Sequence, residues 1–219
     1  RSLYYYNRAL DFNSANPEVY NAIALLFHDF NDYVEAKAYY EKALAIDKNN
    51  INSHVDLGNV HFKMQEYDKA LEHYEKVFEL SPDNKTVATC IANTYAFMQK
   101  NDEADKYYKI ALDLGGDNYK VLICQAIAES DFKNYEKAIE IYKEAIDLCP
   151  EKVNAYILLG NLYSNLNKLE KAQEYYQKAL AINYADANVH MLIANAHYMQ
   201  ENIEKALVSY REAIKIQPE

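Results

Sequence analysis

The feature that most constrains this chain is a pattern that returns every 34 residues. Its marker is an alanine that recurs without insertion or deletion, at Ala36, Ala70, Ala104, Ala138, Ala172 and Ala206. A tyrosine stands four residues after each of these alanines, and a small residue stands three residues further on. Because spacings of three and four residues lie on one helical face, the pattern indicates a helix written six times.

A second helical stretch precedes each marker. Its eighth position is small in every copy, namely Ala24, Gly58, Ala92, Ala126, Gly160 and Ala194. Small residues at matched points let two helix axes approach closely, while the tyrosine fills the space beside them. Helix-stopping residues end the copies, including Pro82, Pro150, Pro218, Gly115-Gly116 and Asn49-Asn50. Each copy therefore predicts an antiparallel helical hairpin.

A hairpin of this kind has apolar faces that it cannot bury alone, whereas stacked copies form one continuous core. The composition agrees, because glycine and proline number only four each and tryptophan is absent. Few helix breakers favour long helices over turn-rich sheets. The sequence thus predicts an all-α fold.

Charge and cysteine content restrict the function. The net charge is −10, from 33 acidic and 23 basic residues, which disfavours nucleic acid and anionic membranes as partners. The three cysteines show no C-x-x-C spacing, so we expect neither a disulfide framework nor a zinc module. Without a signal-peptide pattern or a long apolar run, a cytoplasmic or other reducing compartment is the simplest location.

Motifs for catalysis are missing from the sequence. It contains no glycine-rich phosphate loop, nucleophile elbow or acid pair of recognisable spacing. We therefore expect no enzyme and no catalytic, cofactor or metal-binding residues.

The register and the small-aromatic-small signature resemble the tetratricopeptide repeat family, although the tryptophan typical of the fourth position is missing. The resemblance implies a right-handed α-α superhelix of antiparallel hairpins, forming a single solenoid domain. The expected units are a partial repeat at 1–16 (second helix only), then repeats at 17–50, 51–84, 85–118, 119–152 (degenerate), 153–186 and 187–219.

The resemblance also implies a concave groove lined by positions two, five, nine, twelve and thirteen of each repeat. Asparagine dominates position nine, and its donors and acceptor can hold a peptide backbone; alternatively, it is only the common consensus there. Apolar residues at position five suit an amphipathic or apolar peptide, unless neighbouring helices cover them. The candidate groove residues are Asn59, Asn93, Lys120, Ile123, Ile127, Asn154, Ile157, Asn161, Asn188, Met191, Asn195 and Tyr198.

One binding mode of the family clamps a peptide's terminal carboxylate with lysine, two asparagines, lysine and arginine on three successive first helices. Asn59, Asn93 and Lys120 match three of these places, but Val55 and Cys124 stand where two cations are needed. Losing two cations removes most of the charge-assisted hydrogen bonding, which disfavours this mode.

The histidines do not predict a metal site. His54 and His61 lie seven residues apart, as do His190 and His197, and about 10 Å of helical rise is too far for one zinc ion. Both pairs stand where the family usually places aromatic residues, so we interpret them as packed side chains. His73 shows no partner at a metal or catalytic spacing.

The repeat at 119–152 departs most from the pattern. Gln125 and Glu129 replace apolar residues one turn apart, directly after Gly115-Gly116. Polar side chains at half-buried positions cost stability unless they find partners. Either this junction bends or yields, or neighbouring side chains satisfy both residues and the stack is regular.

Two functions fit these observations. The first is a protein interaction scaffold that binds a peptide or partner helix, within a longer protein. The alternative is a substrate-presenting arm of a larger enzyme such as an O-linked N-acetylglucosamine transferase, whose repeats carry an asparagine ladder. Uncapped repeats also predict end-to-end self-association.

Overall fold

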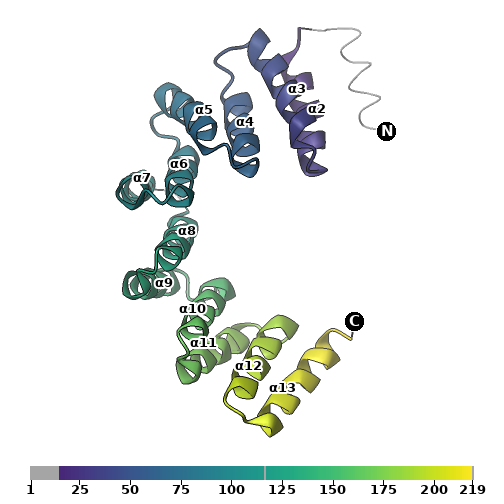
Figure 1. Ribbon diagram of the computed structural model, residues 1–219, viewed down its shortest axis with the longest axis vertical. Helices are drawn as coiled ribbons and strands as arrows, with labels where there is room; N and C mark the ends of the chain where they lie inside the picture. Colours follow the sequence, from purple (N-terminus) through teal and green to yellow (C-terminus); the bar gives the residue numbers. More distant parts are fainter. Residues whose placement is uncertain (1–14, 116, 219) are drawn as a thin grey trace. The chain divides into compact units, whose positions relative to one another are not determined.

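The computed structural model describes residues 15–115 and 117–218, and in these residues it contains helices and no strand (Figure 1). The predicted partial repeat at 1–16 lies outside them, apart from its last two residues. The helices form six pairs: α2 (Pro17–Asp29) with α3 (Tyr33–Ile46), α4 (Ile51–Lys63) with α5 (Tyr67–Leu80), α6 (Lys85–Phe97) with α7 (Asn101–Asp113), α8 (Asn118–Asp131) with α9 (Tyr135–Leu148), α10 (Val153–Asn165) with α11 (Leu169–Ile182), and α12 (Ala187–Met199) with α13 (Ile203–Ile216).

The turn inside each helix pair has the same backbone geometry. One residue of each turn has a positive φ between 55° and 64°, namely Asn31, Gln65, Gln99, Lys133, Asn167 and Glu201. The next amide then reaches back over the end of the first helix, as Glu66 N–H donates to His61 O at 2.9 Å. This left-handed turn ends the first helix and reverses the chain.

Side-chain caps begin most of the first helices. The caps are Asn16, Asn50, Asn84, Asp117 and Asp186, each of which accepts a hydrogen bond from a backbone amide two or three residues later. They satisfy amide groups that have no partner within the helix. Cap and turn together fix both ends of these helices.

Tyrosine packs against small residues in the interior of each pair. Tyr40, Tyr74, Tyr108 and Tyr176 are among the largest fully buried side chains. In the second pair, a Cβ atom added at Gly58 would lie 2.5 Å from Cε1 of Tyr74, so only glycine permits this approach. The small eighth position and the tyrosine therefore meet, as the sequence predicts.

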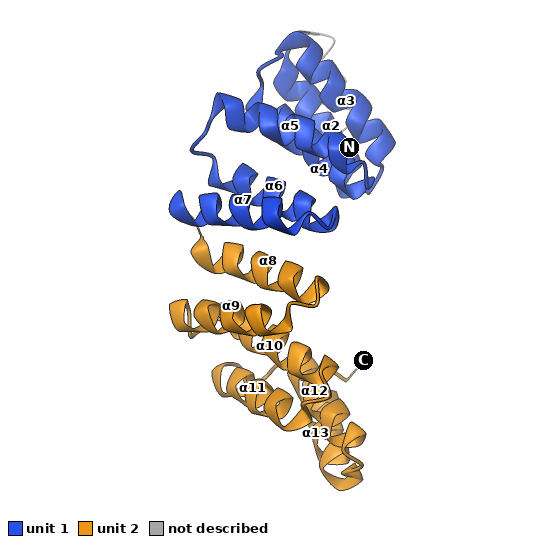
Figure 2. Cartoon of the chain, turned by 60° about the vertical axis from the view of Figure 1, so that its left-hand side comes forward, with its two compact units in different colours: residues 1–116 blue, residues 117–219 orange. Residues whose placement is uncertain are grey.

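The chain divides into two compact units, residues 1–116 and 117–219, coloured separately in Figure 2. Within each unit the second helix of one pair packs on the first helix of the next, as α3 does on α4 and α11 on α12. In unit 1, Tyr74 and Val77 of α5 share a core cluster with Val87 and Ile91 of α6. The all-α solenoid fold is confirmed.

Candidate interaction surface

A hydrogen bond joins the two helices in four of the six pairs. The tyrosine hydroxyl donates to Oδ1 of the asparagine at position nine, 15 residues earlier, in Tyr74–Asn59 (2.8 Å), Tyr108–Asn93 (2.7 Å), Tyr176–Asn161 (2.8 Å) and Tyr210–Asn195 (2.6 Å). This bond orients the amide, because its oxygen is already an acceptor within the chain. The Nδ2 group of each asparagine takes no part in this bond and remains a donor.

Two pairs lack this bond because an aliphatic residue occupies position nine. Leu25 stands there in α2 and Ile127 in α8. Burial raises the pKa of Tyr142, the tyrosine paired with Ile127, to about 12. In the first pair, the buried Tyr40 hydroxyl has no hydrogen bond within 3.5 Å to any described residue.

The surroundings of Tyr40 contain an acid from the next helix pair. Burial first, and the charge of Asp56 second, raise the pKa of Tyr40, so the carboxylate lies near the hydroxyl. The two groups are close enough to interact, although their geometry does not make a well-formed hydrogen bond. Burial also raises the pKa of the Asp56 carboxyl, against the opposing influence of His28.

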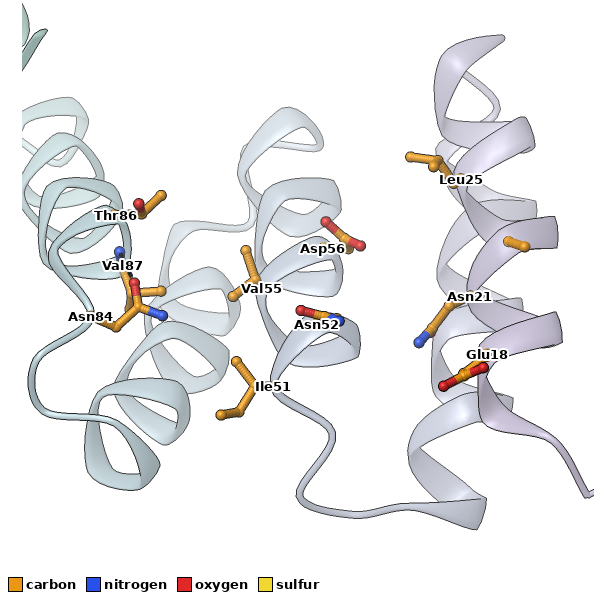
Figure 3. Close-up of a pocket in the computed structure, with 11 residues that line it drawn as sticks. Glu18, Asn21, Leu25, Ile51, Asn52, Val55, Asp56, Asn84, Thr86 and Val87 are labelled. Atoms are coloured by element: carbon orange, nitrogen blue, oxygen red, sulfur yellow. Dashed lines mark hydrogen bonds between the residues drawn. The ribbon is translucent and has the colours of Figure 1, made fainter. Parts of the chain in front are cut away.

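A pocket of about 510 Å³ lies over the first helices of unit 1 (Figure 3). Figure 3 shows that Asn21 and Leu25 project from α2 toward α4, and that Asp56 lies on the side of α4 that faces α2. The Asn21 amide oxygen accepts from Ser53 Oγ at 2.8 Å. The lining residues are Glu18, Asn21, Ala22, Leu25, Ile51, Asn52, Val55, Asp56, Asn84, Thr86 and Val87.

The predicted groove residues of unit 2 differ in how much surface they offer. Tyr198 is 62% exposed and Met191 and Ile127 are also exposed, whereas Ile123 is only 8% exposed and contributes little. Asn154, Asn188, Asn195 and Lys120 are exposed, while Ile157 and Asn161 are half-buried. Asn188 and Met191 line a second pocket of about 400 Å³ with residues of α13.

In unit 1 the structure places no lysine or arginine of the described residues beside the partial match to a carboxylate clamp. Asn59 and Asn93 are half-buried there and bonded to tyrosines, and Lys120 belongs to unit 2. Val55 lines the unit 1 pocket, where none of the described lining residues is basic. Carboxylate capture at this pocket is therefore disfavoured.

Three histidines meet in the second helix pair, which sequence spacing did not reveal. His73 of α5 lies 5.2 Å from His54 and 5.4 Å from His61 between ring centroids, and His54 Nδ1 is 3.0 Å from His73 Nδ1. Burial first, then the neighbouring His54, His61 and Lys37, lower the pKa of His73 to about 4. No group of histidine, cysteine and acidic residues in the described part of the chain is arranged to hold a metal ion.

Glu129 finds partners across the turn of its own helix pair. Its side chain is 4% exposed and lies 2.5 Å from Lys137 Nζ, while Asn134 Nδ2 donates to it at 2.8 Å. The polar group predicted to weaken the 115–135 junction is thus compensated, and α8 is continuous from Asn118 to Asp131. Of the two alternatives for this residue, the structure supports satisfaction by neighbours.

The described residues contain no helix long and apolar enough to cross a membrane. Uncovered apolar side chains remain on α13, where Leu207, Val208 and Ile214 are exposed. End-to-end self-association stays a prediction.

Family models described as the tetratricopeptide repeat match almost the whole chain. They cover residues 17–50, 51–84, 91–152, 131–196 and 187–219. No curated protein sequence matches. The boundaries predicted for the individual repeats stay a prediction. Five of the described helix pairs begin and end inside one predicted repeat, and the pair α8–α9 begins at Asn118, one residue before its predicted repeat at 119–152.

Solved structures with the same fold share little sequence with the chain. A tetratricopeptide repeat protein from Parabacteroides merdae is 20% identical, with a TM-score of 0.75 over 97% of this chain and 84% of that one. PilW, a type IV pilus biogenesis factor, is 17% identical, with a TM-score of 0.72 over 92% of this chain and 94% of that one. The APC/C hetero-tetramer Cut9–Hcn1 gives 18% identity and a TM-score of 0.70 over 97% of this chain, which spans only 42% of the matched chain.

Proposed function

The chain belongs to the tetratricopeptide repeat family, and we propose that it is a protein interaction scaffold that binds a peptide or a partner helix along its first helices. The fold of this family is typically a non-enzymatic scaffold. The binding surface that we propose lies in unit 2 and consists of the position-nine asparagines of α10 and α12 and the apolar side chains beside them.

The observation that carries this proposal is the orientation of the asparagine amides. In α10 and α12, Oδ1 of Asn161 and of Asn195 accepts a tyrosine hydroxyl, so the Nδ2 groups remain as donors. Donors of this kind bind backbone carbonyl oxygens, which every peptide offers whatever its side chains. Recognition through them needs no particular residue in the partner.

Apolar residues of the same two helices supply the other half of the surface. Met191 and Tyr198 of α12 are exposed, and Ile157 of α10 is half-buried. Apolar surface beside backbone donors suits an extended or helical segment that carries apolar side chains.

The test must separate binding from the structural role of the asparagines, which also satisfy their tyrosines. Asn161→Asp combined with Asn195→Asp keeps an oxygen for each hydroxyl and removes the Nδ2 donors. Ile157→Asp removes apolar surface instead. Lys178→Ala, which changes an exposed side chain of α11, is the control.

We expect the asparagine double variant to capture a partner from a cell extract about thirty-fold less well, because two lost hydrogen bonds contribute about 1 kcal/mol each. Ile157→Asp should reduce capture about ten-fold or more, because it replaces apolar contact surface with a charge. The control should capture as much as the unaltered chain. If both variants bind every captured protein unchanged, the proposed surface is wrong.

The alternative, a substrate-presenting arm of a glycosyltransferase, uses the same row of donors. A catalytic domain in the full-length protein would favour it over a passive scaffold.

A further inference from the structure

The pocket over α2, α4 and α6, which we name the acidic pocket, has an uneven distribution of charge. Its described lining includes two carboxylates, Glu18 and Asp56, and no basic side chain. In Figure 3 Glu18, Asn21 and Leu25 project from α2 toward Asp56, while Ile51 and Val55 lie on the side of α4 nearer α6. One part of the pocket is therefore acidic and the other is apolar.

Asp56 is a carboxylate without an adequate counter-ion. Burial raises the pKa of its carboxyl, and the two neighbours that oppose this shift, His28 and the Tyr40 hydroxyl, do not overcome it. A carboxylate removed from water costs free energy until a cation or enough hydrogen-bond donors compensate it. The chain supplies such compensation to Glu129 through Lys137 and Asn134, whereas no lysine or arginine of the described residues acts on Asp56.

A second feature lies next to Asp56. Tyr40 is fully buried, and its hydroxyl lacks a well-formed hydrogen bond to any described residue. In the next pair the equivalent hydroxyl of Tyr74 reaches position nine, where Asn59 accepts it. Position nine in the first pair is Leu25, which lines the pocket. The Tyr40 hydroxyl lies near Asp56, which also lines the pocket, although Tyr40 itself does not.

We propose that the acidic pocket binds a cationic side chain, best an arginine, from an extended peptide segment of the partner. This inference rests on the proposed scaffold function and adds the chemistry of one subsite. A guanidinium carries five donors in a planar fork, which suits carboxylates together with amide and hydroxyl oxygens. The volume of about 510 Å³ accommodates such a side chain, and Ile51 and Val55 contact its apolar neighbours.

The probes are two blocked pentapeptides, acetyl-Ala-Val-Arg-Val-Ala-amide and the same peptide with citrulline in place of arginine. Citrulline keeps the shape and loses the charge. Binding is measured by calorimetry or amide chemical shifts on the full 219-residue chain and on two variants. Asp56→Asn removes the central carboxylate, and Glu41→Gln, on the exposed face of α3, is the matched control.

We expect the arginine peptide to bind about ten-fold or more tightly than the citrulline peptide, and Asp56→Asn to abolish that difference. Glu41→Gln should preserve it. Equal affinities for the two peptides, an arginine preference that survives in Asp56→Asn, or no binding of the arginine peptide at millimolar concentration would each overturn the proposal.

Thermal unfolding separates a binding role from a structural one. Because burial raises the pKa of the Asp56 carboxyl, its charge destabilises the folded chain at neutral pH, and Asp56→Asn should raise Tm while it weakens arginine binding. A fall in both Tm and affinity would indicate a structural role and overturn the inference.

The two proposals also fail separately. If Asp56→Asn leaves arginine recognition unchanged while Ile157→Asp still reduces partner capture, only the acidic pocket is misassigned. If Ile157→Asp and the asparagine variants have no effect, the scaffold surface itself is wrong.

Discussion

The tyrosine of the second helix packs in the same way in all six described helix pairs, but its polar contact differs between four of them and the other two. In the four, the tyrosine donates to the asparagine at position nine; three of these tyrosines are buried, and Tyr210 is half-buried. In α2–α3 and α8–α9 that position is Leu25 or Ile127, yet Tyr40 and Tyr142 are buried just as well. The shape of the repeat therefore does not depend on the bond, and the polar partner at this position is free to vary.

The two exceptional pairs also differ from each other. Near Ile127, the buried Glu129 is paired with Lys137 and accepts from Asn134. Near Leu25, Asp56 approaches Tyr40 without a lysine or arginine partner among the described residues. A compensated acid is typical of a structural role, whereas an uncompensated one beside a pocket is typical of a ligand site.

The largest effect should come from removing the compensation at Glu129. Lys137→Met leaves a nearly buried carboxylate with only Asn134, and we expect a loss of roughly 3 kcal/mol in the free energy of unfolding. Urea denaturation at neutral pH measures it. Lys178→Met is the control, because Lys178 and Glu174 form an exposed pair that contributes at most about 1 kcal/mol. Equal losses in the two variants would show that Glu129 is not effectively buried.

Sequence reasoning could predict the helices because their signals are local and repeated. The spacing of Ala36, Ala70 and their equivalents fixes the pairing of helices, and the tyrosine facing a small residue follows from it. The constant separation of Asn59 and Tyr74 was also visible, and it could have suggested their bond.

Other contacts were not predictable because they depend on turns or on stacking between pairs. Lys137 reaches Glu129 only because the chain reverses at Lys133, which has a φ of 64°. Asp56 reaches Tyr40 only because α4 packs on α3. The repeat in the sequence does not specify which side chains meet across a turn or between stacked helix pairs.

The steric frame of the regular pairs can be tested at position eight. Gly58→Ala places a methyl group 2.5 Å from Cε1 of Tyr74, so the buried ring must move. We expect a net loss of about 2 kcal/mol, since overpacking costs about 1–3 kcal/mol and alanine's better helix propensity returns part of it. Urea denaturation gives the value. A more stable variant would mean that the Tyr74 ring shifts at little cost in free energy.

Low pH should reduce the stability of the pair α4–α5 more than that of α12–α13, although both pairs have histidines at equivalent positions. His190 Nε2 contacts Tyr184 O at 3.0 Å, as His54 Nε2 contacts Lys48 O, but Ser209 stands where α5 has His73. The pKa of His73 is about 4 when folded, against an ordinary value of 6.5. The unfolded chain therefore binds the proton more tightly, and stability falls as the pH drops from 6.5 toward 4.

The expected loss over that range from this residue is roughly 1–2 kcal/mol, allowing for the solvent that reaches the ring. Urea denaturation at a series of pH values measures it, and His73→Gln should flatten the curve by this amount. An unchanged slope in the variant would show that the His54, His61 and His73 cluster tolerates protonation.

The smallest effect comes from making the same substitution in two adjacent helix pairs, one with the tyrosine–asparagine bond and one without it. Tyr74→Phe removes the donor to Asn59, and we expect a loss of about 1 kcal/mol in the free energy of unfolding. Tyr40→Phe removes a buried hydroxyl that has no well-formed hydrogen bond, so stability should stay the same or rise slightly. Urea denaturation of both variants, with unchanged m values, measures the difference. Equal losses of stability would mean that Asp56 accepts a hydrogen bond from Tyr40 as effectively as Asn59 does from Tyr74. Asp56 would then have a structural partner, which would weaken the case for a ligand at the acidic pocket.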